Sequence, residues 1–193
     1  LASNGYGQAW TGNGGLTEDT TVYALWNQDD ANATKYDVWV AGVQVTDNNK
    51  DYICADGIST NTGRIWYEPS TRTLTFEDHV EIEYDGAVIN HDVYDKETRV
   101  GLTIVFPDGT GNKLINTETN ATGEVYGINA SNRSTTISGG VVTIETKDNP
   151  KATKNIAIYT GSTWLIIDNG ADVTVKAGSA GKGESYGIAS DIA

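Results

Sequence analysis

Apolar residues along most of this chain fall in short alternating runs rather than in long helical stripes. Val, Ile, Thr and Tyr cluster in these runs, and Gly, Asn, Asp and Ser separate them. Alternation with a period of two residues is typical of β-strands, because successive side chains point to opposite faces of a strand. The pattern therefore predicts an all-β chain.

Two hairpins are predicted near the start of this β region. The first places Trp39 on one face and four valines on the other, on either side of the tight turn Ala41-Gly42. These valines are Val38, Val40, Val43 and Val45. The second hairpin joins residues 64–67 to residues 72–76 through Glu68-Pro69-Ser70-Thr71, because proline at the second position of a turn presets φ.

A longer pattern recurs after these hairpins: an apolar triplet, a short polar link, an apolar pair, a polar loop and a closing apolar unit. Ile128, Ile158 and Ile188 in the closing units are 30 residues apart, and so are Ile137 and Ile167 in the triplets. A fixed period of this length is typical of stacked units that bury a face only against their neighbours. An antiparallel sandwich also accommodates short strands, but the regular spacing favours a solenoid.

We therefore expect a right-handed parallel β-helix over residues 36–193, covered at its N-terminal end by the hairpins. Its inward positions are expected to be β-branched residues, which suit stacked pleated walls. They are Ile104, Ile128, Ile137, Val142, Ile144, Ile158, Ile167, Val173, Val175 and Ile188. No polar capping segment follows the last apolar unit, so further coils are expected after Ala193.

The first 26 residues have a different residue pattern and end in a threonine-rich motif, Thr20-Thr21-Val22-Tyr23-Ala24-Leu25-Trp26. This motif resembles the closing half of the Listeria-Bacteroides repeat, also called the internalin B-repeat type. The resemblance implies a partial small β-repeat at residues 1–26 and a place on a secreted or wall-anchored protein of Gram-positive or gut bacteria. We expect a linker at residues 27–35.

Residues 36–193 resemble the repetitive β-helix regions that follow such modules in large clostridial surface proteins. The phrases at residues 36–46 and 73–76 carry this likeness. It implies an extracellular, cell-surface or secreted location and transfers no catalytic residue. The leading hypothesis is a non-catalytic module that acts in adhesion or as a spacer, with a host or neighbouring-cell protein or glycan as its partner.

The charge balance narrows the range of partners. Asp and Glu number 26 against 13 Lys and Arg, so the net charge of −13 repels phosphate backbones and anionic membrane surfaces. No apolar run reaches the roughly 18 to 20 residues that a membrane helix needs. We expect no nucleic-acid partner, no membrane insertion and a monomer.

The chain is rich in aromatic residues, with five Trp and ten Tyr. Exposed Trp and Tyr rings stack on the apolar faces of sugars, so Trp39, Trp66, Tyr67, Tyr84 and Tyr94 are a candidate platform for a glycan. The alternative is a hydrophobic cap over the first coil. A carbohydrate-binding module is therefore the second functional hypothesis.

An incomplete polysaccharide lyase or hydrolase is the third hypothesis, because pectate lyases and polygalacturonases are also parallel β-helices. The acidic residues here lie in turns rather than at matched positions on adjacent coils, so no catalytic residue is predicted. His79 and His91 are expected at the surface. No cofactor is expected, with structural calcium at Asp108, Asp168 and Asp172 as the alternative, because Asp-Gly turns supply oxygen ligands.

Overall fold

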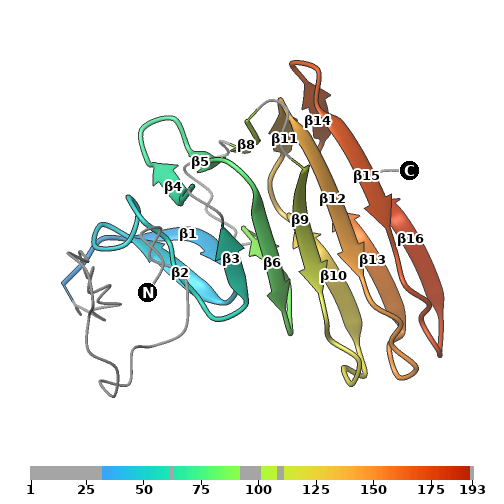
Figure 1. Cartoon of the computed structure of the whole chain (residues 1–193). Helices are drawn as coiled ribbons and strands as arrows, with labels where there is room; N and C mark the ends of the chain where they lie inside the picture. The colour runs from blue at the N-terminus through green and yellow to red at the C-terminus, as the bar shows by residue number, and fades with distance from the viewer. Residues whose placement is uncertain (1–31, 61–62, 92–100, 108–110, 192–193) are drawn as a thin grey trace, which may run out of the picture.

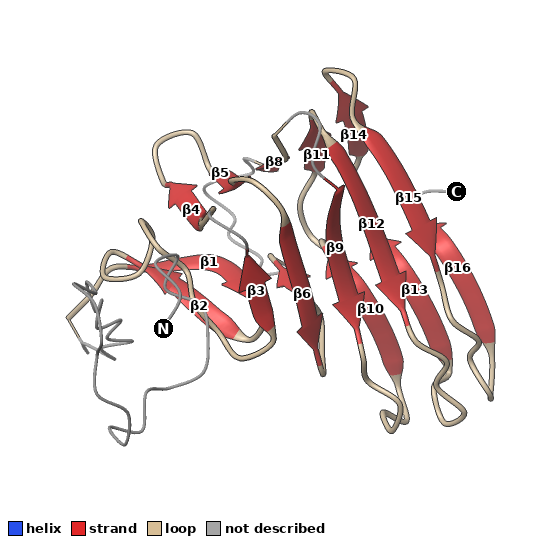
Figure 2. Ribbon diagram, in the orientation of Figure 1, coloured by secondary structure: helices blue, strands red, loops and turns tan. Residues whose placement is uncertain are grey.

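The computed structural model describes residues 32–60, 63–91, 101–107 and 111–191. These residues form sixteen β-strands, joined by turns and loops (Figure 2). No helix of the described residues is long and apolar enough to cross a membrane. The prediction of an all-β chain is confirmed.

Twelve of the described strands form four stacked coils of three strands each, shown from green to red in Figure 1. The first coil holds β5 (Thr73–Phe76), β6 (Val80–Tyr84) and β7 (Ile89–Asn90). The second holds β8 (Leu102–Val105), β9 (Gly111–Asn116) and β10 (Glu124–Asn129). The third holds β11 (Thr135–Ser138), β12 (Val141–Thr146) and β13 (Lys154–Tyr159), and the fourth holds β14 (Leu165–Asp168), β15 (Asp172–Lys176) and β16 (Glu184–Ala189).

Equivalent strands of successive coils pair in parallel, so the coils share three sheets and the fold is a parallel β-helix. The spacing of 30 residues sets the register as the sequence predicts. Ile137 pairs with Ile167, and Ile158 pairs with both Ile128 and Ile188. The periodic residues therefore stack directly upon one another along the solenoid.

Four antiparallel strands cap the first coil: β1 (Lys35–Val40), β2 (Val43–Thr46), β3 (Ile58–Thr60) and β4 (Ile65–Glu68). Both predicted hairpins are confirmed, β1 with β2 and β4 with β5. The turn Ala41-Gly42 has φ angles of 46° and 75°, the left-handed region that tight hairpin turns require. β1 also pairs with β7 and β3 with β6, so each of the three sheets begins with an antiparallel strand.

Parallel pairing thus begins at β5 rather than at Tyr36, and the hairpin cap extends over Lys35–Glu68. β1 starts at Lys35, the last residue of the expected linker. The expected partial repeat at residues 1–26 lies outside the described residues.

The interior is a continuous column of aliphatic and aromatic side chains. Six of the predicted inward positions are fully buried: Ile104, Ile128, Ile137, Val142, Ile144 and Ile158. The predicted inward positions of the last coil pair with buried residues of the third coil but are less covered. Ile167 and Ile188 are 46% and 47% exposed, and Val173 and Val175 are partly exposed and pack against the core. No strand of the described residues covers the outer edge of β14, β15 or β16, so these side chains are packed from one side only.

Candidate functional site

Among the described residues of the proposed glycan platform, Trp39, Trp66 and Tyr67 do not share one face. Trp39 lies on β1 in the six-stranded sheet, whereas Trp66 lies on β4 in a five-stranded sheet, with the Arg64 guanidinium carbon 5.9 Å from the centre of its ring. Tyr67 is 2% exposed and belongs to the hydrophobic core. It therefore acts as part of the cap and is not available to stack on a sugar, which corrects its assignment to the platform.

Tyr84 is the fourth platform candidate within the described residues. Tyr84 ends β6, and its ring covers the hairpin turn at Gly42, where an added Cβ atom would lie 2.8 Å from the ring carbon Cζ. Tyr84 is partly buried against the core. Tyr94 lies outside the described residues.

The predicted calcium ligands lie on a turn of the last coil. Asp168 ends β14 and Asp172 begins β15, and both side chains are exposed on either side of Asn169-Gly170. Asp108 lies outside the described residues. Within the part of the chain that the structure describes, no group of three or more His, Cys, Asp or Glu side chains could hold a metal ion.

A row of aromatic and amide residues crosses the outer face of the six-stranded sheet, whose order is β16-β13-β10-β7-β1-β2. Residues of adjacent strands are paired along this row, which we call the outer row: Trp39 with Asn90, Asn90 with Asn129, and Asn129 with Tyr159. The preceding or following residue on each strand is fully buried: Val40, Ile89, Ile128 and Ile158. Because side chains alternate along a strand, the outer row points away from the core, and each member is partly exposed.

A second tyrosine extends the aromatic surface beside the outer row. The ring of Tyr126 on β10 stacks on that of Tyr159, with centroids 5.1 Å apart and planes 21° from parallel. The Tyr159 hydroxyl donates a hydrogen bond to Asp191 Oδ2 at 2.5 Å, and the Tyr126 hydroxyl donates one to Glu124, whose other oxygen lies 2.8 Å from Lys154 Nζ. Both rings are therefore held in fixed positions by neighbouring carboxylates.

These contacts also keep the two tyrosine hydroxyls protonated. The hydrogen bond to Asp191, followed by burial, raises the pKa of Tyr159 to about 12. Burial and then the hydrogen bond to Glu124 raise the pKa of Tyr126 well above its ordinary value of 10.0. At neutral pH the surface thus presents neutral aromatic rings and uncharged hydroxyl groups.

A buried ionic cluster lies where the cap meets the coils. Asp37 on β1 accepts a hydrogen bond from Arg72 Nη1 at 2.8 Å through Oδ1, and its Oδ2 lies 2.7 Å from Arg133 Nη2. The side chains of Arg133, Arg72 and Asp37 are 2%, 15% and 19% exposed. The sequence gives no local signal for this cluster, because Asp37 and Arg72 are 35 residues apart and belong to different elements.

His91 lies beside this cluster and is fully buried, which corrects its expected place at the surface. Its Nε2 lies 2.8 Å from the Thr135 hydroxyl oxygen. Burial lowers the pKa of His91 to about 3, and the positive charges of Arg72 and Arg133 contribute to the decrease. The imidazole is therefore neutral at physiological pH, and the cluster fastens β1 and β7 to the third coil.

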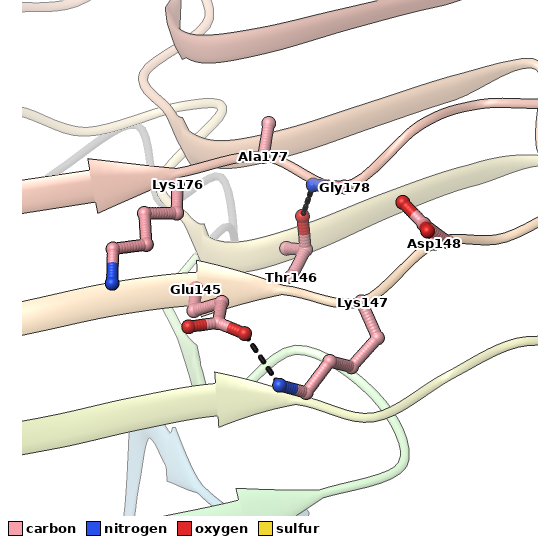
Figure 3. A pocket seen from close by; sticks show the side chains of 7 residues that line it. All are labelled: Glu145, Thr146, Lys147, Asp148, Lys176, Ala177 and Gly178. Atoms are coloured by element: carbon pink, nitrogen blue, oxygen red, sulfur yellow. Dashed lines mark hydrogen bonds and ion pairs between the residues drawn. The ribbon is translucent and has the colours of Figure 1, made fainter.

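A shallow hollow of about 230 Å³ lies at the corner where β12 and β15 end, between residues 145–148 and 176–178 (Figure 3). Lys147 pairs with Glu145 beside it, the Gly178 N–H donates to the Thr146 hydroxyl oxygen at 3.1 Å, and Asp148 accepts a hydrogen bond from Ser179 N at 2.7 Å. The Thr146 and Asp148 contacts tie the third coil to the fourth, so these polar groups serve the stacking of coils.

Comparison of this chain with protein families, curated proteins and solved structures finds no match. The likeness to internalin-type and clostridial repeats stays a prediction from the sequence.

Proposed function

We propose that this chain is a non-catalytic module of a bacterial cell-surface protein that acts in adhesion or as a spacer outside the cell. The observation that carries this proposal is the stack of four coils on one continuous core. In a solenoid each unit contacts only its neighbours, so the molecule extends in one direction and displays long, flat outer faces. Such a form suits a module that holds a binding surface away from its point of attachment.

The proposed location and partner rest on the sequence. The phrases at residues 20–26, 36–46 and 73–76 support a place on the surface of a Gram-positive or gut bacterium. The net charge of −13 favours partners other than nucleic acids and anionic membranes. The partner on this account is a protein or a glycan of a host or neighbouring cell, bound by a monomer.

The adhesive role is tested with beads that carry this chain, washed under flow over epithelial cell layers and over purified bacterial cell walls. Beads coated with an unrelated globular protein of the same net charge are the control. Retention above this control on either surface supports adhesion. Retention no greater than that of the control beads on both surfaces contradicts the adhesive role and leaves the spacer role, which predicts a fixed length by small-angle X-ray scattering.

A carbohydrate-binding module is the second candidate function. The observation that favours it is the outer row with its stacked tyrosines, because aromatic rings interspersed with side-chain amides are the groups that contact sugars. Among the described residues of the predicted aromatic platform, Trp39 is the one that belongs to this row.

A further inference from the structure

We propose that the outer row is the binding site of an extended, neutral polysaccharide that lies across the strands of the six-stranded sheet. This inference deepens the second candidate function by assigning its site and the class of its ligand. It stands apart from the adhesion or spacer role, which requires no glycan.

The strand pairing of the sheet sets the distance between Trp39 and Tyr159, the aromatic residues at the two ends of the row. This distance suits an oligosaccharide. Trp39 on β1 and Tyr159 on β13 are separated by β7 and β10. Neighbouring strands lie about 4.8 Å apart, so the row is about 14 Å long. Two rings at this separation can each stack on a different sugar of one extended chain, whereas a single monosaccharide reaches one ring.

The centre of the row offers polar groups between the two rings. Asn90 and Asn129 stand side by side on β7 and β10, and amide side chains both donate and accept hydrogen bonds. Asn129 Oδ1 accepts a hydrogen bond from Ser131 N at 3.3 Å, which orients its amide. Asn90 is partly exposed, but its Oδ1 is covered and has no hydrogen-bond partner among the described residues. A ligand contact at this oxygen requires the side chain to turn outward, and it would then remove the free-energy cost of the unpaired group.

The charges around the row select for a neutral ligand. Glu124 and Asp191 lie beside the tyrosine pair, and the nearby cation Lys154 is paired with Glu124. A uronate or sulfated polysaccharide would meet these carboxylates and the net charge of −13. Neutral hexoses and N-acetylated hexosamines meet no such repulsion, and their hydroxyl groups can donate to the carboxylates.

The other two tryptophans of the described residues lie outside this arrangement. Trp164 is 72% exposed on the loop between β13 and β14. Trp66 is partly exposed on the edge strand β4 of another sheet, next to Arg64. These two residues therefore serve as controls for removal of an indole outside the outer row.

The test is isothermal titration of the whole chain with soluble linear oligosaccharides of glucose, mannose, galactose and N-acetylglucosamine, and with polygalacturonate as the anionic polymer. We expect at least one neutral oligosaccharide to bind, with polygalacturonate not binding. Trp39→Ala and Tyr159→Ala should each weaken that affinity about tenfold, the loss that corresponds to one stacked aromatic ring.

Two variants separate stacking from loss of structure. Trp164→Ala and Trp66→Ala remove indoles outside the row. Both should change the affinity by no more than about twofold, as surface substitutions outside a site do. Circular dichroism and the thermal midpoint of each variant establish that the fold is kept, and Tyr159→Ala alone suffices if Trp39→Ala does not fold.

Three results would overturn the inference. They are the absence of binding to every neutral oligosaccharide, a preference for polygalacturonate, and an equal loss of affinity in Trp164→Ala and Tyr159→Ala. If chain-coated beads are retained on cells but the chain binds none of these sugars in titration, the adhesive role is supported and the outer row is rejected as a glycan site.

Discussion

Asp37 forms ion pairs with two arginine side chains. Two arginines lie within 2.8 Å of its carboxylate, and the three side chains are at most 19% exposed. We expect Asp37→Asn to lower the free energy of unfolding by about 3 to 5 kcal/mol, because it leaves two buried guanidinium groups without a counter-charge. Urea denaturation at neutral pH measures this loss.

The matched control for that substitution is Asp51→Asn. Asp51 pairs with Lys50 at 3.1 Å, but its side chain is 77% exposed. An exposed ion pair contributes less than about 1 kcal/mol, so this variant should unfold close to the parent chain. Similar losses for both substitutions would contradict the structural role of the Asp37 cluster.

His91 makes stability depend on pH in a window between about pH 3 and pH 6.5, whose upper part lies above the range where most carboxylates titrate. Burial holds its pKa near 3 in the folded chain, against an ordinary value of 6.5 in the unfolded chain. Between these values the unfolded chain binds a proton that the folded chain does not, so stability is full above pH 6.5 and falls as the pH decreases. The loss should approach about 1.4 kcal/mol per pH unit.

Comparison of the parent with His91→Gln at pH 6.5, 5.5 and 4.5 isolates this effect. Glutamine does not titrate, and its amide can bond to Thr135 as the imidazole does. The stability of the variant should therefore vary less with pH than that of the parent. Parallel pH profiles for the two chains would show that His91 is accessible to protons in the folded state.

Among the strands, the position within the stack decides how much an inward isoleucine stabilises the fold. Ile128 on β10 and Ile188 on β16 occupy equivalent places in the six-stranded sheet, yet Ile128 is fully buried and Ile188 is 47% exposed. We expect Ile128→Ala to cost about 2 to 5 kcal/mol. Ile188→Ala should cost less than about half of that, because it leaves no enclosed cavity.

Thermal and urea unfolding of these two variants, measured side by side, check that expectation. The chemical change is the same in both variants, so the difference between their losses of unfolding free energy measures how much an adjacent strand covers the isoleucine. Equal costs would mean that the last coil is packed as tightly as the second, against the exposures observed.

Strands and hairpins were predictable because their signals are local. The turn Ala41-Gly42 and the turn after Glu68 specify the two hairpins, and the period of 30 residues fixes the parallel register of β10, β13 and β16. The pairing of β1 with β7 and of β3 with β6 was not predictable, since no local pattern says which sheet edge a cap strand joins. The start of parallel pairing was therefore placed too early.

The candidate site was predictable only in part, for the same reason. Asn129 and Tyr159 directly follow Ile128 and Ile158, which the 30-residue period aligns. The repeat alone therefore indicates that these two side chains lie side by side on one face. Trp39 was selected for its aromatic ring, but its place in the row depends on the β1–β7 pairing. The platform residues Trp66 and Tyr67 were grouped with it because they are aromatic, and residue type alone does not determine which face a side chain occupies.

At the scale of the whole molecule, four coils on one core present an acidic surface with a neutral aromatic row on one sheet. This combination is the basis of the proposal that the molecule binds neutral sugars. Binding to neutral glycans should change little between 50 mM and 500 mM salt, because stacking and hydrogen bonds to uncharged groups are not screened by ions. A steep loss of affinity with salt, measured by titration, would point instead to an ionic partner.

The most direct test of this account is incubation of the chain with insoluble neutral polysaccharides, followed by assay of both the bound protein and the released reducing ends. The account predicts depletion of the chain from solution, reversed by Tyr159→Ala, with no release of sugar above a protein-free control. Release of reducing ends that scales with the amount of chain would contradict the central claim, because it would make the solenoid an enzyme rather than a binding module.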